Sequence, residues 1–92
     1  MLYQISYELK KADKDYSDLY LAIKKLGKKY AHPMETVWFV DSNSNLSEVS
    51  KSLTPYIDPI SDKLLVTQIW VNGLGGRAST DFWKWIKDCF GI

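Results

Sequence analysis

The chain has 92 residues, enough for one domain with a single hydrophobic core. Hydrophobic residues make up 46% of it and aromatic residues 14%, a composition that excludes a disordered protein. The net charge of +1 argues against a strongly basic protein that binds nucleic acid by overall electrostatic attraction.

The single cysteine, Cys89, excludes an intrachain disulfide and a cysteine-based zinc site, and it favours a reducing compartment. The N-terminal residues lack the basic-then-apolar pattern of a signal peptide, and no apolar run reaches membrane-spanning length. We therefore expect a cytoplasmic protein, in the host cytoplasm if it is viral, with no membrane partner. One domain is expected over residues 1–92, with a core over 1–72 and a glycine loop and helix over 73–92.

The first segment, residues 1–9, alternates between two kinds of side chain, as a strand does. One side is apolar or aromatic and the other is polar: Tyr3, Ile5, Tyr7 and Leu9 against Gln4, Ser6 and Glu8. Glu8 stands at the strand exit, before a polar turn over residues 10–14. A carboxylate in that position suits metal-assisted chemistry; the alternative is a solvent-facing or lysine-paired group.

Residues 15–27 predict a helix that Asp15 caps, with Asp18 close to completing a capping box and Gly27 at its C-terminal end. Its apolar stripe recurs at helical spacing: Tyr16, Leu19, Tyr20, Ile23 and Leu26. Lysines cluster before and after this helix: Lys10, Lys11 and Lys14, then Lys24, Lys25, Lys28 and Lys29. Both groups are either solvated surface or phosphate contacts, and the contact candidates are Lys10, Lys11, Lys24 and Lys28.

Residues 30–41 should be extended, with 36–40 the clearest strand and Pro33 a break or bulge at its beginning. Asn45 and Glu48 form the signature of a second capping box, and Pro55 should shorten the end of that helix. Residues 63–71 predict a third strand, apolar enough to be central. Ser79 should cap a last helix whose inner side is Phe82, Ile86, Cys89 and Phe90.

Because one side of the first strand is polar, both long helices are expected on its apolar side. The fold class is α+β, a ferredoxin-like two-layer sandwich with helices on one face of a mainly antiparallel sheet, plus a C-terminal helix. Only three strands are clear. The fourth is either the segment around residues 30–32 or a strand from a partner subunit.

The glycine-rich loop before the last helix is a candidate site for a phosphate or nucleotide. Glycines let backbone N–H groups approach an anion, and an arginine can contact a phosphate through two hydrogen bonds. The candidate residues are Gly73, Gly75, Gly76, Arg77 and Ser79. The alternative is a flexible connection in which the glycines only turn the chain.

His32 is the single histidine, and a His–Cys pair with Cys89 is weighed against a structural or exposed histidine. The four tryptophans could stack on bases or serve as core and subunit contacts. The sequence favours the structural alternative for both.

Segments 1–9, 15–27, 35–41 and 62–66 together resemble the SinR-family small proteins, and through them the ferredoxin-like CRISPR-associated adaptation protein and VapD-type ribonucleases. The resemblance implies a homodimer and, in some relatives, divalent-metal-dependent cleavage of RNA or DNA. The positions that match the relatives' catalytic pair are Tyr7 and Glu8, with Glu8 where those relatives carry Asp.

The sharpest hypothesis is that Glu8 binds Mg²⁺ or Mn²⁺ with its symmetry mate, with Asp41 or Glu35 assisting. The expected function is therefore that of a nucleic-acid-associated homodimer, with metal-dependent nuclease activity possible. The alternative is a non-catalytic module that binds a nucleotide or phosphate through residues 73–77, or a protein partner.

Overall fold

The computed structural model describes residues 1–11, 14–70 and 72–92. Four antiparallel strands form one sheet in the order β2-β3-β1-β4, with β1 and β3 in the centre. This order and the alternation of helices with strands make the fold a ferredoxin-like α+β sandwich, as predicted. The elements in chain order are β1 (Leu2–Glu8), α1 (Ser17–Lys24), β2 (Lys29–Met34), β3 (Val37–Asp41), α2 (Leu46–Leu53), the 3-10 helix η1 (Thr54–Tyr56), β4 (Lys63–Ile69) and α3 (Thr80–Phe90).

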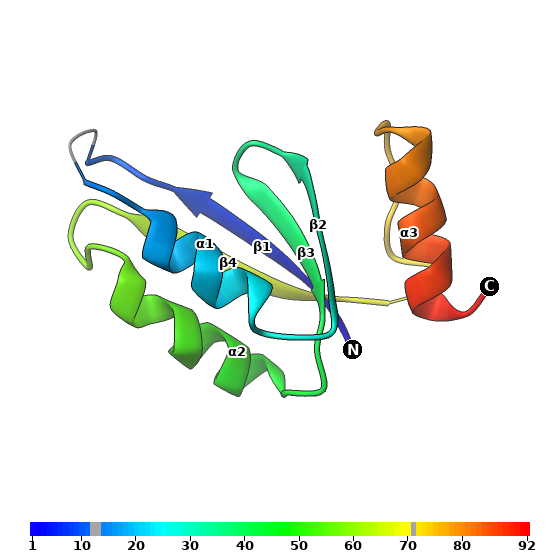
Figure 1. Ribbon diagram of the computed structural model, residues 1–92, viewed down its shortest axis with the longest axis horizontal. Helices are drawn as coiled ribbons and strands as arrows, with labels where there is room; N and C mark the ends of the chain where they lie inside the picture. The colour runs from blue at the N-terminus through cyan, green and yellow to red at the C-terminus, as the bar shows by residue number, and fades with distance from the viewer. Residues whose placement is uncertain (12–13, 71) are drawn as a thin grey trace.

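Helices α1 and α2 lie side by side on one face of the sheet, here called the first face (Figure 1). The apolar side of β1 faces them: Tyr3, Ile5 and Tyr7 are buried, Gln4 and Ser6 are half-buried, and Glu8 is exposed. The predicted sidedness is confirmed. Burial of this alternating set fixes the register, because a slip of one residue would turn the polar side chains inward.

The other face of the sheet, here called the second face, was expected to be open. Instead, α3 packs on one end of it (Figure 1). That end is apolar: Leu2, Phe39 and Ile69 form a buried cluster with Phe82 and Ile86 of α3. The polar part of β1 begins only after Leu2, so α3 covers one end of the second face and leaves the Glu8 end uncovered.

The fourth strand is β2, formed by the chain itself around residues 30–32. Its pairing with β3 changes register between Ala31 and Met34, which is where Pro33 stands. Proline cannot donate a ladder hydrogen bond and is tolerated on an edge strand or at a bulge. The bulge predicted at Pro33 is confirmed.

Strand β4 is an edge strand, so the prediction that it is central is wrong. Its residues alternate: Leu64 and Val66 pack under the helices, while Leu65 on the second face is 71% exposed. The apolar residues of β4 therefore lie on both faces of the sheet, one covered by the helices and the other exposed at Leu65. The predicted strand extended to residue 71, and Val71 lies outside the described residues.

Capping signals were read correctly for two helices and incorrectly for one. Asn45 and Glu48 form the predicted capping box, Pro55 falls in η1 after α2 ends, and Ser79 Oγ accepts from Phe82 N–H. Helix α1 begins only at Ser17: the carboxylate of Asp15 accepts from Ser17 N–H in a turn that precedes the helix, rather than capping it.

Gly27 lies beyond α1 without the left-handed backbone that a glycine cap adopts. A glycine is needed at this position for lack of space, because a Cβ atom there would overlap the carbonyl oxygen of Asp41. Gly27 thus lets the chain between α1 and β2 cross close to the end of β3. In the described parts of the chain, no helix is long and apolar enough to cross a membrane.

Candidate nucleic-acid interface

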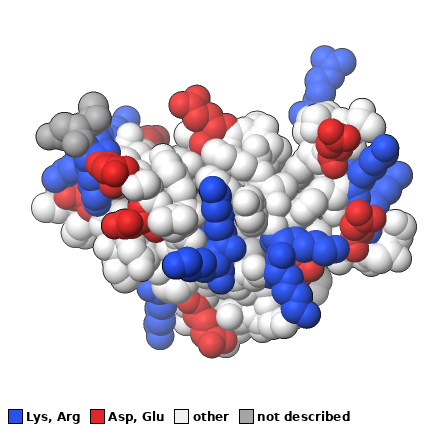
Figure 2. Space-filling model, in the orientation of Figure 1, with Lys and Arg blue, Asp and Glu red and all other residues white. Residues whose placement is uncertain are grey.

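A basic and aromatic surface lies where the C-terminal end of α1 meets β2 on the first face. Figure 2 shows Lys and Arg side chains gathered in the middle of this side of the molecule. The exposed residues that form it, here called the α1–β2 surface, are Lys24, Lys28, Tyr30 and His32. Lysine and aromatic side chains on one surface can contact both the phosphates and the bases of a nucleic acid.

Trp38 of β3 supports the aromatic part of this surface from beneath. The indole is 4% exposed, and the His32 ring stacks on it with centroids 3.8 Å apart and planes at 13°. The Tyr30 ring lies 6.0 Å from the indole, tilted by 47°, and is itself 46% exposed. Trp38 is therefore core, as the sequence favoured, while Tyr30 and His32 present their rings outward.

Hydrogen bonds hold the indole in place. Trp38 Nε1–H donates to the Tyr7 hydroxyl at 3.0 Å, and that hydroxyl donates to the Glu35 carbonyl oxygen at 3.0 Å. His32 Nε2 lies 3.1 Å from the same carbonyl oxygen, to which it donates when that nitrogen is protonated. Burial raises the pKa of Tyr7, so the phenol stays neutral and its hydroxyl links Trp38 to the Glu35 backbone.

The Lys24 ammonium lies above the aromatic rings, 5.8 Å from the centre of Tyr30 and 5.9 Å from that of Trp38. These distances permit a cation–π attraction that holds the ammonium over the surface. Lys28 is exposed in the bend before β2, two positions before Tyr30. Neither lysine has an ion pair with a carboxylate among the described residues.

The other two lysines of this group lie elsewhere. Lys25 lines a groove between α1 and η1, with Leu21 and Tyr56. Lys29 is near enough to Cys89 of α3 to act on the pKa of that thiol, and it therefore belongs to the side of α3. Of the four lysines between residues 24 and 29, Lys24 and Lys28 remain the candidate contacts of the α1–β2 surface.

The lysines before α1, here called the loop lysines (Lys10, Lys11 and Lys14), have partners. Lys10 Nζ lies 3.1 Å from Glu8 Oε1, and Lys11 Nζ lies 2.8 Å from Asp58 Oδ2. Lys14 Nζ donates to the carbonyl oxygen of Tyr56 at 3.4 Å. A nucleic-acid contact through Lys10 or Lys11, the two candidates in this group, is therefore less favourable, because a phosphate would compete with their carboxylate partners.

A buried carboxylate, Asp62, organises the region of the loop lysines, and sequence reasoning missed it. It accepts from the Tyr16 hydroxyl at 2.8 Å and 2.9 Å, from Lys10 N–H at 2.9 Å and from Asp58 N–H at 2.9 Å. Burial acts to raise the pKa of Asp62, but these hydrogen bonds outweigh it and the pKa is lowered. The pKa of Asp58 is also lowered, chiefly by Lys11. The network ties the turn before α1 to the turn before β4.

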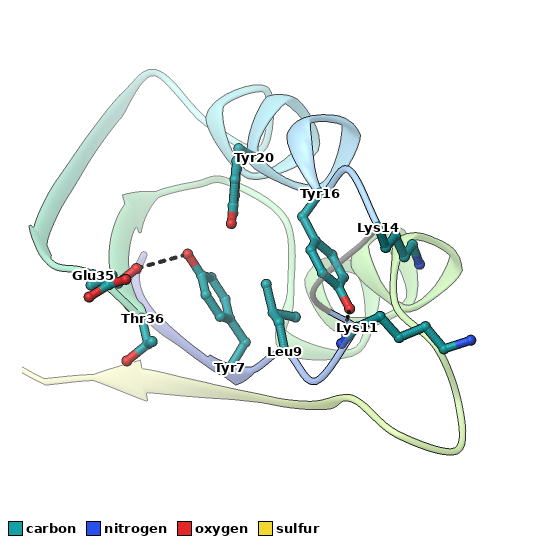
Figure 3. A pocket seen from close by; sticks show the side chains of 8 residues that line it. All are labelled: Tyr7, Leu9, Lys11, Lys14, Tyr16, Tyr20, Glu35 and Thr36. Atoms are coloured by element: carbon teal, nitrogen blue, oxygen red, sulfur yellow. Dashed lines mark hydrogen bonds between the residues drawn. The ribbon is translucent and has the colours of Figure 1, made fainter.

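A hollow of about 290 Å³ opens beside this network, between α1, β1 and the β2–β3 turn. Figure 3 shows the Tyr7, Tyr16 and Tyr20 rings around it, with the ammonium ends of Lys11 and Lys14 directed away. The Glu35 side chain lines the opposite wall. An aromatic hollow with a carboxylate and outward lysines is poorly suited to an anionic ligand.

The predicted catalytic and metal residues do not converge within one chain. Tyr7 is buried on the first face, whereas Glu8 points to the second face and pairs with Lys10. Asp41 pairs in register with Leu2 at the far end of β1, about 20 Å from Glu8 at ~3.3 Å per residue. Asp41 also binds the N-terminal ammonium at 3.3 Å. Within one chain, no three His, Cys, Asp or Glu side chains among the described residues form a cluster that could hold a metal ion.

The glycine loop is exposed and lies between β4 and α3. Gly73 N–H donates to the Trp70 carbonyl oxygen at 2.8 Å, and Gly76 has a φ of 138°, which only glycine adopts readily. The loop brings Arg77 to the second face beside α3. The His–Cys pair does not form, because His32 lies on the first face and Cys89 packs with the second.

Comparison with known proteins adds no family to this description. No protein-family model matches the chain, and no curated protein matches its sequence.

Proposed function

We propose that this chain binds single-stranded nucleic acid on the α1–β2 surface. The observation that carries the proposal is the position of the Lys24 ammonium above the Tyr30 ring, which is 46% exposed. An exposed ring with a cation beside it offers a stacking platform for a base and a contact for the adjoining phosphate. The resemblance to SinR-type and CRISPR-adaptation proteins also favours a nucleic-acid partner.

Single strands suit this surface better than duplexes. Stacking on Tyr30 or His32 requires a base that is not already stacked within a helix. The two lysines supply little charge, so binding should be weak, with a log–log salt slope near −1.4 for two phosphates at about −0.7 each. This expectation agrees with the net charge of +1.

The test is fluorescence anisotropy with labelled single strands of about 12 nucleotides, DNA and RNA, against the matching duplexes. Tyr30→Ala should weaken single-strand binding about tenfold, since a base stacked on an aromatic side chain contributes ~1–3 kcal/mol. Tyr56→Ala is the matched control, because Tyr56 is 40% exposed on η1, away from the surface. Equal affinity of the parent and Tyr30→Ala, or a preference for duplexes, would reject the proposal.

Metal-dependent cleavage is a second candidate, and it requires a second copy of the chain. The observation in its favour is that Glu8 is exposed on the part of the second face that α3 leaves uncovered, near the exposed Leu65. Two copies joined across that part would bring two Glu8 carboxylates to one interface, as the resemblance implies. Glu8 pairs with Lys10 in the single chain, and a metal would have to displace that lysine.

Light scattering and a cleavage assay test this second candidate together. A homodimer that cleaves RNA or DNA only with Mg²⁺ or Mn²⁺, and loses the activity in Glu8→Gln, would support it. A monomer over the whole accessible concentration range, or cleavage equal in parent and variant, would reject it without affecting the binding proposal.

A further inference from the structure

A separate hollow lies on the second face, between the sheet and the glycine loop with α3. Its volume is about 260 Å³, slightly below the ~300 Å³ at which pockets for drug-sized ligands begin. We call it the second-face hollow. The lining residues that matter here are Gln4, Phe39, Leu74, Arg77, Phe82 and Trp83.

The walls of the second-face hollow are aromatic. Phe39 of β3 and Phe82 of α3 lie 5.0 Å apart between centroids, and Phe82 lies 5.3 Å from Trp83 at 64°. Phe39 and Phe82 are buried, while Trp83 is half-buried and contributes a wall. Aromatic walls of this kind favour a flat ring system.

Two polar side chains interrupt these walls. Gln4 is half-buried, and its amide makes one long hydrogen bond, Nε2–H to Ser6 Oγ at 3.5 Å. A side-chain amide offers both donors and an acceptor, which match the edge of a nucleobase. Arg77 is exposed at the rim and has no ion pair among the described residues.

The charged side chains around the second-face hollow favour an anionic ligand. No carboxylate belongs to its lining in the described parts of the chain, in contrast to the hollow of Figure 3, where Glu35 is present. A guanidinium binds a phosphate through two parallel hydrogen bonds. The space around the rim at Gly75 is open, because a Cβ there would meet nothing within 4 Å.

We infer that the second-face hollow binds a mononucleotide, with the base against Trp83 and Phe82, the base edge at Gln4 and the phosphate at Arg77. The chemistry shared by possible ligands is a flat aromatic ring with an anionic group. This site lies on the face opposite the α1–β2 surface and does not depend on the nucleic-acid proposal.

Calorimetry on the full chain tests the inference with the four ribonucleoside 5′-monophosphates, their nucleosides, inorganic phosphate and benzoate. At least one monophosphate should bind saturably, and its nucleoside should bind about tenfold more weakly for loss of the charged contact. Arg77→Ala should reduce monophosphate binding to a similar extent. Lys84→Ala, on the exposed side of α3, should leave it unchanged.

Two-dimensional NMR locates the ligand. The Trp83 indole N–H and the Gln4 side-chain amide signals should shift with the same saturation as the calorimetric titration. The inference is overturned if no monophosphate saturates, if Arg77→Ala binds as the parent does, or if the Gln4 and Trp83 signals do not move. Benzoate bound as tightly as the best monophosphate would reject the nucleotide in favour of an aromatic carboxylate.

Discussion

The loop lysines and the lysines of the α1–β2 surface flank the same helix but have different surroundings. Lys10 and Lys11 pair with Glu8 and Asp58, beside the network that Asp62 organises. Lys24 instead stands next to aromatic rings, and neither Lys24 nor Lys28 has an ion pair with a carboxylate in the described residues. The first group holds turns together, while the second leaves its charge available. Positive charge in the sequence therefore predicts a binding surface only where no carboxylate already pairs with it.

The largest expected effect is that of Gly27→Ala, which tests whether the connection beneath the α1–β2 surface is rigid. Gly27→Ala places a Cβ against the Asp41 backbone carbonyl, which cannot move without disturbing β3. We expect a loss of about 3 kcal/mol in the free energy of unfolding, typical of overpacking, measured by urea denaturation. Gly75→Ala, with open space around it, is the control and should change stability by less than ~1 kcal/mol. A well-tolerated Gly27→Ala would mean that the connection between α1 and β2 is adaptable.

The second prediction concerns Asp58 and Asp62, beside the loop lysines, and how the stability of the fold depends on acid pH. Folding lowers the pKa of Asp58 and Asp62 from the ordinary value of 3.8, so both carboxylates stabilise the folded state above that value. Stability should fall as the pH drops below it and the folded-state groups become protonated. Asp62→Asn should lower stability at neutral pH and flatten this acid dependence, as measured by urea denaturation at several pH values.

The control for Asp62→Asn is Asp18→Asn, because Asp18 is exposed on α1. It should leave the acid dependence intact. An unchanged pH profile in Asp62→Asn would show that the network does not hold the two turns together, and the contrast between the two lysine groups would weaken.

The smallest effect is expected at Glu8. Glu8 and Lys10 are both more than half exposed, and such ion pairs contribute ~0–1 kcal/mol. Glu8→Gln should change the free energy of unfolding by no more than that, and less in high salt. A loss above about 2 kcal/mol would show that this pair is part of the scaffold and that Glu8 is not free for chemistry.

Local signals in the sequence predicted much of the fold. Asn45 with Glu48, Pro33 and Ser79 act on neighbouring backbone, so their effects could be read directly. The alternation over residues 1–9 predicted which face of the sheet the two long helices cover. By contrast, the end of the second face that α3 covers depends on Leu2, Phe39 and Ile69, which meet only in the folded sheet.

The candidate sites were less predictable because their partners are distant in sequence. Asp58 neutralises Lys11 and Asp62 binds Tyr16 across two turns, and no spacing rule signals either contact. Likewise, His32 stacks on Trp38 because of the β2–β3 register. Lys24 and Lys28 were named from their clustering alone, and their freedom from carboxylates became visible only in three dimensions.

The most direct test compares two double variants by their salt dependence of single-strand binding. Lys24→Ala with Lys28→Ala should reduce the log–log salt slope by about 1.4, since each phosphate contact contributes ~0.7. Lys10→Ala with Lys11→Ala should leave the slope near that of the parent, because those ammonium groups already face carboxylates. Equal reductions in both pairs, or a reduction only in the second, would contradict the proposed α1–β2 binding surface.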